Sequence, residues 1–252
     1  MVKREIASGI LCYQFPPAEG KHFGFSLHVL LDEQTRTALI IDTAYESQAS
    51  AVRADLTAMG YGLTTAVISH FHPDHIVGLQ ALPDIEIVGN SRWEETLFQF
   101  GSKDELTPFF PTQVATESTR LAFGPFNLGF RPAPGHSACS QYTIIDNSFV
   151  HVADNVMTSN EGQDILPWAE FAEIADHIAS LELLRTLANR TFLLSHGRTL
   201  DNKNTRLEAI DNRIRYFQNV LDGDGAYPYE QATRGCTCEF LHQEWFIQRD
   251  TG

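Results

Sequence analysis

Residues 69–75 read Ser69-His70-Phe71-His72-Pro73-Asp74-His75 and form the most informative segment of the sequence. It places four side chains able to bind a metal ion within six residues, directly after a β-branched segment expected to be a strand. Imidazole and carboxylate ligands suit zinc or iron. Because alternate side chains of an extended segment share a face, His70 and His72 can contact one ion. Pro73 then turns the chain, which brings Asp74 and His75 toward a second ion.

Two ligands per ion are too few, and three further segments supply more. His136 follows Pro134-Gly135, in a turn between two strand-like segments. Asp154 and His196 each end a strand-like segment, in Val152-Ala153-Asp154 and Leu194-Ser195-His196-Gly197. Loops at strand ends are where a rigid scaffold commonly places functional groups. The sequence therefore predicts a metal centre assembled from four separate segments.

The rest of the chain mixes strand and helix signals. Strands are expected at residues 25–31, 37–41, 65–69, 85–88, 120–131, 142–152 and 191–195, the first two forming a hairpin. Helices are expected at residues 46–59, 74–82, 169–187 and 204–221, with a loop or broken helix at 98–111. Hairpins combined with strand–helix–strand units predict an α/β or α+β class with layered sheets.

Composition narrows the classes of function. The 252 residues carry 32 acidic and 18 basic side chains, a net charge of −14, which disfavours nucleic acid as a partner. No apolar run approaches the roughly 18 residues of a membrane span, and the start does not read as a signal peptide. We therefore expect a cytoplasmic protein with a small-molecule substrate and no membrane partner. The four cysteines, including Cys236 and Cys238, are expected to be reduced thiols without an assigned role.

The motifs, taken in order, resemble those of the metallo-β-lactamase-fold hydrolase superfamily. The His-x-His-x-Asp-His motif of that family is matched by His70, His72, Asp74 and His75. Its later ligand motifs are matched by His136, Asp154 and His196, and its strand-ending upstream aspartate by Asp42. The resemblance covers about residues 25–198 and implies a four-layer αββα sandwich. We expect residues 1–252 to form one domain, with a C-terminal helix and tail over 199–252.

The resemblance also implies roles for these residues. One ion would be held by His70, His72 and His136, and the other by Asp74, His75 and His196. Asp154 would bridge the two ions, and Asp42 would orient ligands from behind. Two divalent cations are expected, with Zn2+ as the default and iron or manganese also suited to these ligands. A water shared by two ions loses a proton near neutral pH, and Asp74 and Asp154 could hydrogen-bond the resulting nucleophile, which makes them candidate catalytic residues.

Other side chains carry weaker signals. Arg198 could contact an anionic substrate group, and Phe71, Trp168 and the Phe109–Phe110 pair could line an apolar pocket, although such residues are more often solvated or part of the core. The remaining histidines are expected to be structural or exposed: His22, His28, His151, His177 and His242. His151 is expected to be a strand residue.

Several branches of the family fit poorly. The commonest zinc β-lactamases carry a cysteine ligand where this chain has Asp154, and flavin-linked diiron relatives carry a glutamate in place of His72. What remains is similar to glyoxalase II-like thioesterases and to lactonases. The lactonases usually have a tyrosine soon after the bridging aspartate, whereas this chain reads Asn155-Val156-Met157 there.

Three hypotheses remain open at this point, together with the question of a homodimer. The first is a dinuclear hydrolase of a small ester, lactone or thioester. The second is a mononuclear iron enzyme similar to persulfide dioxygenases, which would bind about one iron per chain and consume oxygen. The third is a non-catalytic metal-binding protein on the same scaffold. A complete set of ligands favours the first hypothesis over the third.

Overall fold

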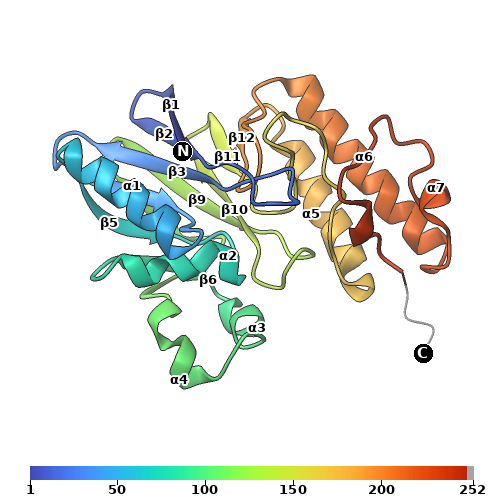
Figure 1. Cartoon of the computed structure of the whole chain (residues 1–252), viewed down its shortest axis with the longest axis horizontal. Coiled ribbons are helices and arrows are strands. Elements are labelled where there is room, and N and C mark those ends of the chain that lie inside the picture. Colours follow the sequence, from blue (N-terminus) through green and yellow to red (C-terminus); the bar gives the residue numbers. More distant parts are fainter. Residues whose placement is uncertain (249–252) are drawn as a thin grey trace.

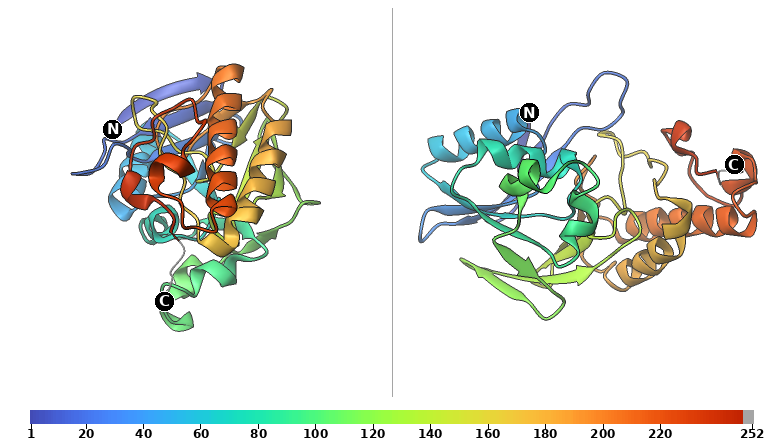
Figure 2. Two further views of the ribbon diagram at one scale, coloured as in Figure 1. Left: turned by 90° about the vertical axis from the view of Figure 1, so that its right-hand side faces the viewer. Right: turned by 90° about the horizontal axis from the view of Figure 1, so that it is seen from below.

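A computed structural model describes residues 1–248 and contains two β-sheets that face each other, with helices on their outer sides (Figures 1 and 2). The expected class, a mixed α and β architecture with layered sheets, is confirmed. No helix among the described residues is both long enough and apolar enough to cross a membrane.

The first sheet has seven strands in the order β1 to β7. Its strands are β1 (Val2–Ala7), β2 (Ile10–Gln14), β3 (Ser26–Asp32), β4 (Thr37–Ile41), β5 (Gly62–Val67), β6 (Glu86–Asn90) and β7 (Gln113–Ala115). Neighbours from β1 to β4 are antiparallel, and neighbours from β4 to β7 are parallel. The predicted hairpin is confirmed as β3 and β4, whereas β1, β2 and β7 were not predicted from the sequence.

The second sheet has the order β12-β11-β10-β9-β8. Its strands are β8 (Arg120–Phe123), β9 (Phe126–Pro132), β10 (Gln141–Ile145), β11 (Phe149–His151) and β12 (Thr191–Leu193). The single strands expected at 120–131 and 142–152 are wrong, because each is two strands that form a hairpin. Gly124 and Asp146 adopt positive φ angles of 51° and 50°, which turn the chain back inside those segments.

Helices occupy the outer faces of the two sheets. They are α1 (Glu46–Ala58), α2 (Pro73–Ile76), α3 (Trp93–Leu97), α4 (Lys103–Leu106), α5 (Ile174–Thr186), α6 (Lys203–Asp222) and α7 (Tyr229–Ala232). Short 3-10 helices follow or precede them at Val77–Ala81, Thr107–Phe109, Phe171–Glu173 and Gln243–Trp245. The broken helix expected at 98–111 is confirmed as α4 and the 3-10 turn after it.

Three separate apolar clusters define the layers. One lies between α1 and the first sheet and includes Val52 and Ile40. Another fills the space between the sheets and includes Leu39. The third joins the second sheet to α5 and α6 and includes Phe192 and Phe217. Three interfaces between four layers form the αββα sandwich implied by the family resemblance.

The predicted ligands lie just past the carboxyl ends of strands. Asp42 follows β4, His70 follows β5, His136 follows β9, Asp154 follows β11 and His196 follows β12. Strands from both sheets therefore deliver these side chains to one edge of the sandwich. The rigid sheets hold the loops, and the loops carry the polar groups.

Candidate metal centre

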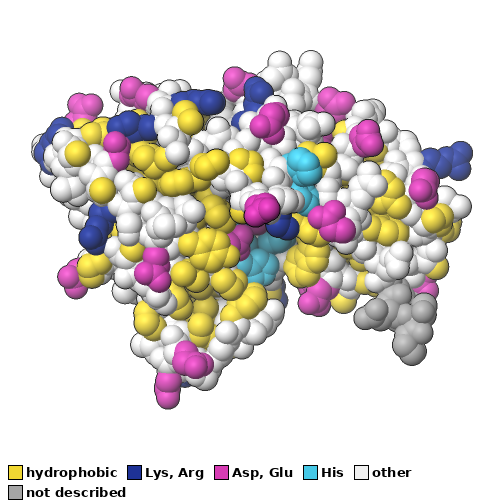
Figure 3. All heavy atoms as spheres, in the orientation of Figure 1, with side chains coloured by type: hydrophobic (Ala, Val, Ile, Leu, Met, Phe, Trp, Pro, Cys, Tyr) yellow, Lys and Arg dark blue, Asp and Glu magenta, His cyan; other side chains and the backbone are white. Residues whose placement is uncertain are grey.

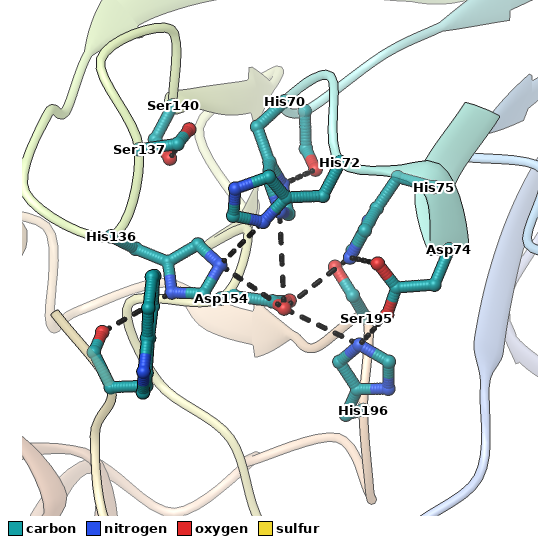
Figure 4. A network of polar contacts seen from close by, with 12 residues as sticks. His70, His72, Asp74, His75, His136, Ser137, Ser140, Asp154, Ser195 and His196 are labelled. Carbon is teal, nitrogen blue, oxygen red and sulfur yellow. Dashed lines mark hydrogen bonds and ion pairs between the residues drawn. The ribbon is translucent and has the colours of Figure 1, made fainter. Parts of the chain in front are cut away.

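The structure brings all seven predicted ligands together (Figure 4). Three groups of side chains have ligand atoms within 4.8 Å of one another: His70, His72 and His136; His70, His75 and Asp154; and Asp74, His75 and His196. Each of these groups could hold a metal ion. Two of the three groups are the ligand sets that the family motifs implied.

The first group is formed by three imidazoles. The Nδ1 atom of His72 lies 3.1 Å from Nε2 of His70 and 3.1 Å from Nε2 of His136. Ligands of a tetrahedral ion with bonds of about 2.0–2.1 Å lie about 3.3 Å apart. The three nitrogens therefore have the spacing of one face of such a site. His72 presents Nδ1 where its two neighbours present Nε2.

The second group combines two imidazoles with a carboxylate. His196 Nε2 lies 3.5 Å from Asp74 Oδ2, and His75 Nε2 lies 3.8 Å from Asp74 Oδ1. His75 and His196 are buried, whereas about a third of the Asp74 side chain is exposed. Asp74 is thus the ligand that faces the open side of this group.

Asp154 lies between the two groups. Its Oδ2 atom is 3.3 Å from Nε2 of both His75 and His196, 3.7 Å from Nε2 of His136 and 4.0 Å from Nε2 of His70. Figure 4 shows this carboxylate pointing into the space that the histidines surround. One oxygen within reach of both groups can be shared by two ions.

Buried polar atoms without partners test whether the residues fit a metal. Among the described residues, three atoms of the implied ligands, His75 Nε2, His196 Nε2 and Asp154 Oδ1, are buried and make no hydrogen bond; the ring nitrogens of His28 and His177 share this property away from the ligands. An unpaired buried polar atom is costly, and a coordinated cation satisfies it. The donor set and its unpaired atoms therefore fit divalent metal ions.

Four of the five histidines are anchored through their second ring nitrogen. His136 Nδ1 lies 3.3 Å from the Trp168 carbonyl, and His196 Nδ1 lies 3.4 Å from the Gly24 carbonyl. A carbonyl oxygen only accepts, so in these two rings Nδ1 carries the proton and Nε2 keeps its lone pair for a metal. His70 Nδ1 lies 3.1 Å from the Ser69 hydroxyl.

Asp42 provides the fourth anchor. Its Oδ2 atom lies 2.9 Å from His75 Nδ1 and accepts a hydrogen bond from the Ser69 hydroxyl, while its Oδ1 atom accepts one from the Ser69 backbone N–H. The Ser195 hydroxyl donates to Oδ2 as well. The buried Asp42 carboxylate thus links His75 to Ser69 and Ser195, which directly precede His70 and His196 in the sequence. Its φ angle of 57° is a left-handed conformation that the dense hydrogen bonding stabilises.

Electrostatics differ between the two groups. Burial, together with neighbouring histidines, lowers the pKa of His72 to about 3 and holds the pKa of His70 well below its ordinary value. These imidazoles are therefore neutral at pH 7, as metal ligands must be. Burial also acts to lower the pKa of His196, but Asp154 and Asp74 outweigh it and raise that pKa to about 9. The carboxylates thus favour positive charge in the second group, and a metal ion would supply that charge in place of the proton on His196 Nε2.

The ligands open into a cavity of about 650 Å3. Its lining includes Asp74, Asp154, His72, His136 and His196 together with mainly aromatic and aliphatic side chains. Of the predicted substrate contacts, Trp168 lines this cavity. A hollow with visible histidines, flanked by hydrophobic side chains, appears on the face in Figure 3. The arrangement can bind a small molecule against the metal ligands.

The other predicted contacts lie elsewhere. Arg198 lines a different cavity, where its guanidinium donates to the Glu161 carbonyl. Gly197 has a φ angle of 92°, which turns the chain after His196 and takes Arg198 away. Phe71 is fully buried and packs against Trp93 in the core, because it alternates with His70 and His72 in an extended segment. Phe109 and Phe110 also belong to a core cluster.

The sequence reasoning missed several residues at the site. Tyr45, Lys21, Phe23 and Trp245 line the cavity, but no motif or spacing pointed to them. His151 is a strand residue, as expected, and its Nε2 atom also lies 3.9 Å from Asp42 Oδ2 behind the ligands. Only its position three residues before Asp154 gave a signal.

Comparisons with known proteins agree with this geometry. A family model described as the metallo-beta-lactamase superfamily matches residues 23–196. The chain therefore belongs to the metallo-β-lactamase superfamily. A search of curated proteins gave no match.

Solved structures with this fold are similar over most of the chain. A HARLDQ-motif mutant of a metallo-beta-lactamase from Cronobacter sakazakii is 16% identical with a TM-score of 0.69, over 90% of this chain and 100% of that one. ETHE1 from Myxococcus xanthus is 17% identical with a TM-score of 0.61, over 89% and 95% of the two chains. At these identities the likeness is one of fold.

Proposed function

We propose that this protein is a dinuclear metal-dependent hydrolase that cleaves a small ester, lactone or thioester. The observation that carries the proposal is the position of Asp154 Oδ2, within 3.3–4.0 Å of histidines from both ligand groups. A mononuclear site would need only one of these groups. Two ligand groups that meet at one carboxylate favour two ions.

In this proposal His70, His72 and His136 would hold one ion, Asp74, His75 and His196 would hold the other, and Asp154 would be available to both. Bound divalent cations lower the pKa of a coordinated water and polarise a carbonyl group. Zinc suits these ligands best, and iron or manganese would also be accepted. Asp42 positions His75, and the carbonyls of Trp168 and Gly24 position His136 and His196.

The chain supplies further groups for the reaction. The partly exposed Asp74 carboxylate can accept a hydrogen bond from the attacking water and orient it. Tyr45 lines the same cavity, and burial together with the nearby Asp74 raises the pKa of its phenol. The phenol therefore stays protonated at neutral pH and can donate a hydrogen bond to the substrate oxygen. Tyr45 would thus fill the place left by the missing tyrosine after Asp154.

Hydrolysis in this site balances simply. A bond forms between the water oxygen and the acyl carbon, the acyl–oxygen or acyl–sulfur bond breaks, and the water proton passes to the leaving group. Among the described residues lining the cavity, Lys21 is the only lysine or arginine. Beyond the metal ions, the lining thus offers a phosphodiester a single cation, whereas its apolar side chains suit an uncharged ester. The lining therefore favours carboxylic esters and thioesters.

Metal analysis followed by a substrate panel tests the proposal. We expect about two metal ions per chain after purification with zinc, because a site with seven ligands binds tightly. The purified protein should hydrolyse members of an ester, lactone and thioester panel but not a phosphodiester. A chelator should abolish the activity, and added zinc should restore it. Metal content below about 0.3 per chain would contradict the proposal, while one iron per chain with oxygen consumption would favour the mononuclear alternative.

A further inference from the structure

One wall of the cavity comes mostly from outside the matched family segment. The ligands all lie within residues 23–196, whereas Pro16, Ala18, Lys21 and Trp245 lie beyond it. These residues belong to the loop 15–25 and the tail 240–247, which are far apart in sequence. We call the part of the cavity formed by Lys21, Phe23 and Trp245 the aromatic wall.

The loop 15–25 is clamped at its base. Asn160 donates from Nδ2 to the Phe15 carbonyl at 2.9 Å and accepts from the Gly24 N–H at 3.0 Å. The Asn160 backbone N–H donates to the His22 carbonyl. Both ends of the loop are therefore tied to one residue, which holds Phe23 in place between them.

The tail is anchored to the segment that follows Asp154. Leu241 donates from its N–H to the Asp164 carbonyl and accepts from the Leu166 N–H, at 2.9 and 3.0 Å. Phe240 is buried in the core, and the Ile247 N–H donates to the Tyr216 hydroxyl at 3.1 Å. These contacts fix the tail on both sides of Trp245.

Loop and tail meet at Trp245. Its ring lies 5.7 Å from Phe23, and His242 stacks on it at 4.7 Å. The ammonium group of Lys21 lies 5.3 Å over the same ring, within the range of a cation–π contact. Phe23 also packs 5.0 Å from the ring of His196. The aromatic wall therefore extends from Trp245 through Phe23 to the metal ligand His196.

The remaining lining continues this apolar character. Phe25, Tyr45, Met157 and Trp168 complete the cavity, and the Trp168 ring lies 5.8 Å from His136. The rim carries exposed Tyr45 and Trp168, at 42% and 41% of their surfaces. A cavity of 650 Å3 holds on the order of 20 non-hydrogen atoms, at about 30 Å3 each. That volume exceeds what a two-carbon acyl group needs.

From this geometry we infer that the substrate carries a large apolar group, of about six carbons or more, which packs against the aromatic wall while its ester, lactone or thioester carbonyl faces the metal ligands. The reaction named here rests on the proposed hydrolase function, whereas the preference for an apolar group rests on the aromatic wall. Polar side chains that could recognise a sugar or a nucleotide are sparse in the described lining: outside the metal ligands they are Gln48, Lys21, the Tyr45 hydroxyl and the indole N–H groups of Trp168 and Trp245.

A chain-length series with matched variants tests the inference. For the zinc-loaded protein we expect kcat/KM for p-nitrophenyl esters to rise from acetate through butyrate and hexanoate to octanoate. A fully buried methylene contributes about fourfold, so burial of only three of the six methylenes that separate octanoate from acetate gives a rise of about 50-fold, which is the minimum expected. Trp245→Ala and Phe23→Ala should flatten this rise while metal content stays at the wild-type value, and Trp245→Phe should restore most of it. Tyr227→Ala, an exposed aromatic outside the cavity, is the control.

A binding measurement separates this inference from the hydrolase proposal. Titration with 2-decanone, which cannot be hydrolysed, should quench the intrinsic tryptophan fluorescence, whereas 2-butanone should not. Trp245→Ala should weaken 2-decanone binding about tenfold or more. Wall-dependent ketone binding without ester hydrolysis would support the apolar site and overturn the hydrolase proposal. Ester hydrolysis that is independent of chain length, or an unchanged slope in Trp245→Ala, would overturn the inference.

Discussion

The metal ligands and the aromatic wall share one cavity but are built differently. The ligands come from strand ends inside the matched family segment, and four of the five histidines are fixed through a second ring nitrogen. The wall comes from a loop and a tail that lie mostly outside that segment, fixed through hydrogen bonds to Asn160 and Asp164. Its side chains meet through ring packing and the cation–π contact of Lys21 with Trp245. Under the two proposals above, the family segment would supply the chemistry and the flanking segments would set the specificity.

His72→Ala should separate the two regions most clearly. The change removes the nitrogen that lies 3.1 Å from both His70 and His136, so one ion should be lost. We expect hydrolysis to fall about a thousandfold or more, since bound metal supplies several kcal/mol of transition-state stabilisation. Binding of 2-decanone at the wall should stay within about twofold. Metal content and fluorescence titration measure the two effects.

The exposed His22 offers a matched control for that variant, because it lies on the wall loop and outside the ligand groups. His22→Ala should retain full metal content. Equal loss of metal in both variants would show that the ligand assignment is wrong.

Asp42→Asn should give the next largest effect. The amide cannot replace the carboxylate that faces His75 Nδ1 and accepts from Ser69 twice. Loss of a partner that orients a ligand lowers metal affinity by about 10-fold to 100-fold. Buried charge-assisted hydrogen bonds also stabilise the fold, so the free energy of unfolding should fall by about 2 kcal/mol. Metal competition and urea denaturation measure these changes.

Asp176→Asn, an exposed position on α5, is the matched control and should change neither quantity. Wild-type metal affinity in Asp42→Asn would mean that His75 needs no orienting carboxylate. That result would weaken the contrast between the interlocked ligands and the wall.

Tyr45→Phe tests the boundary between the two regions. The phenyl ring keeps the apolar lining, so ketone binding and metal content should be unchanged. Loss of the hydroxyl should lower kcat by about tenfold to a hundredfold if it donates to the substrate oxygen. Tyr227→Phe should have no effect on kcat. An unchanged kcat in Tyr45→Phe would mean that Tyr45 only lines the cavity and takes no part in the reaction.

Ala153→Gly should have the smallest effect, and with the opposite sign. Ala153 has a φ angle of 51° and directly precedes Asp154. A left-handed alanine costs about 1–2 kcal/mol, and the greater freedom of glycine in the unfolded chain offsets part of that gain. We expect the free energy of unfolding to rise by about 0.5 kcal/mol in thermal denaturation. Ala179→Gly, on the exposed face of α5, should instead lower it by about 1 kcal/mol.

The ligand residues were predictable because their signal is local. The spacing of His70, His72, Asp74 and His75 is visible within six residues, and the turn before His136 is marked by Gly135. Gly135 has a φ angle of 128°, and an added Cβ would lie 2.3 Å from the Cα of His177. No side chain could be accommodated there. The long helices α1, α5 and α6 were predictable for the same reason, since caps and periodicity act over a few residues, although α5 begins at Ile174 and not at 169. The short helices α3 and α7 were not predicted.

The wall was not predictable because its signal is spread over the whole chain. Phe23 and Trp245 are 222 residues apart and have no spacing relation, so only folding brings their rings within 5.7 Å. The hairpins at Gly124 and Asp146 were missed because apolar residues continue on both sides of each turn. Arg198 was expected near the substrate because it lies two residues after His196, but the turn at Gly197 directs it elsewhere.

Gly24 and Trp168 each orient a metal ligand through the backbone carbonyl and also line the cavity. The Gly24 carbonyl holds His196 while Gly24 lines the cavity, and the Trp168 carbonyl holds His136 while its ring lines the cavity. Protein engineers could therefore exchange the side chains at 23 or 245 to seek new substrates. Replacing residues 15–25 with a loop from another protein would also displace the Gly24 carbonyl, which orients His196. Redesign of selectivity in this scaffold should proceed by point substitution and leave the backbone path at residues 24 and 168 intact.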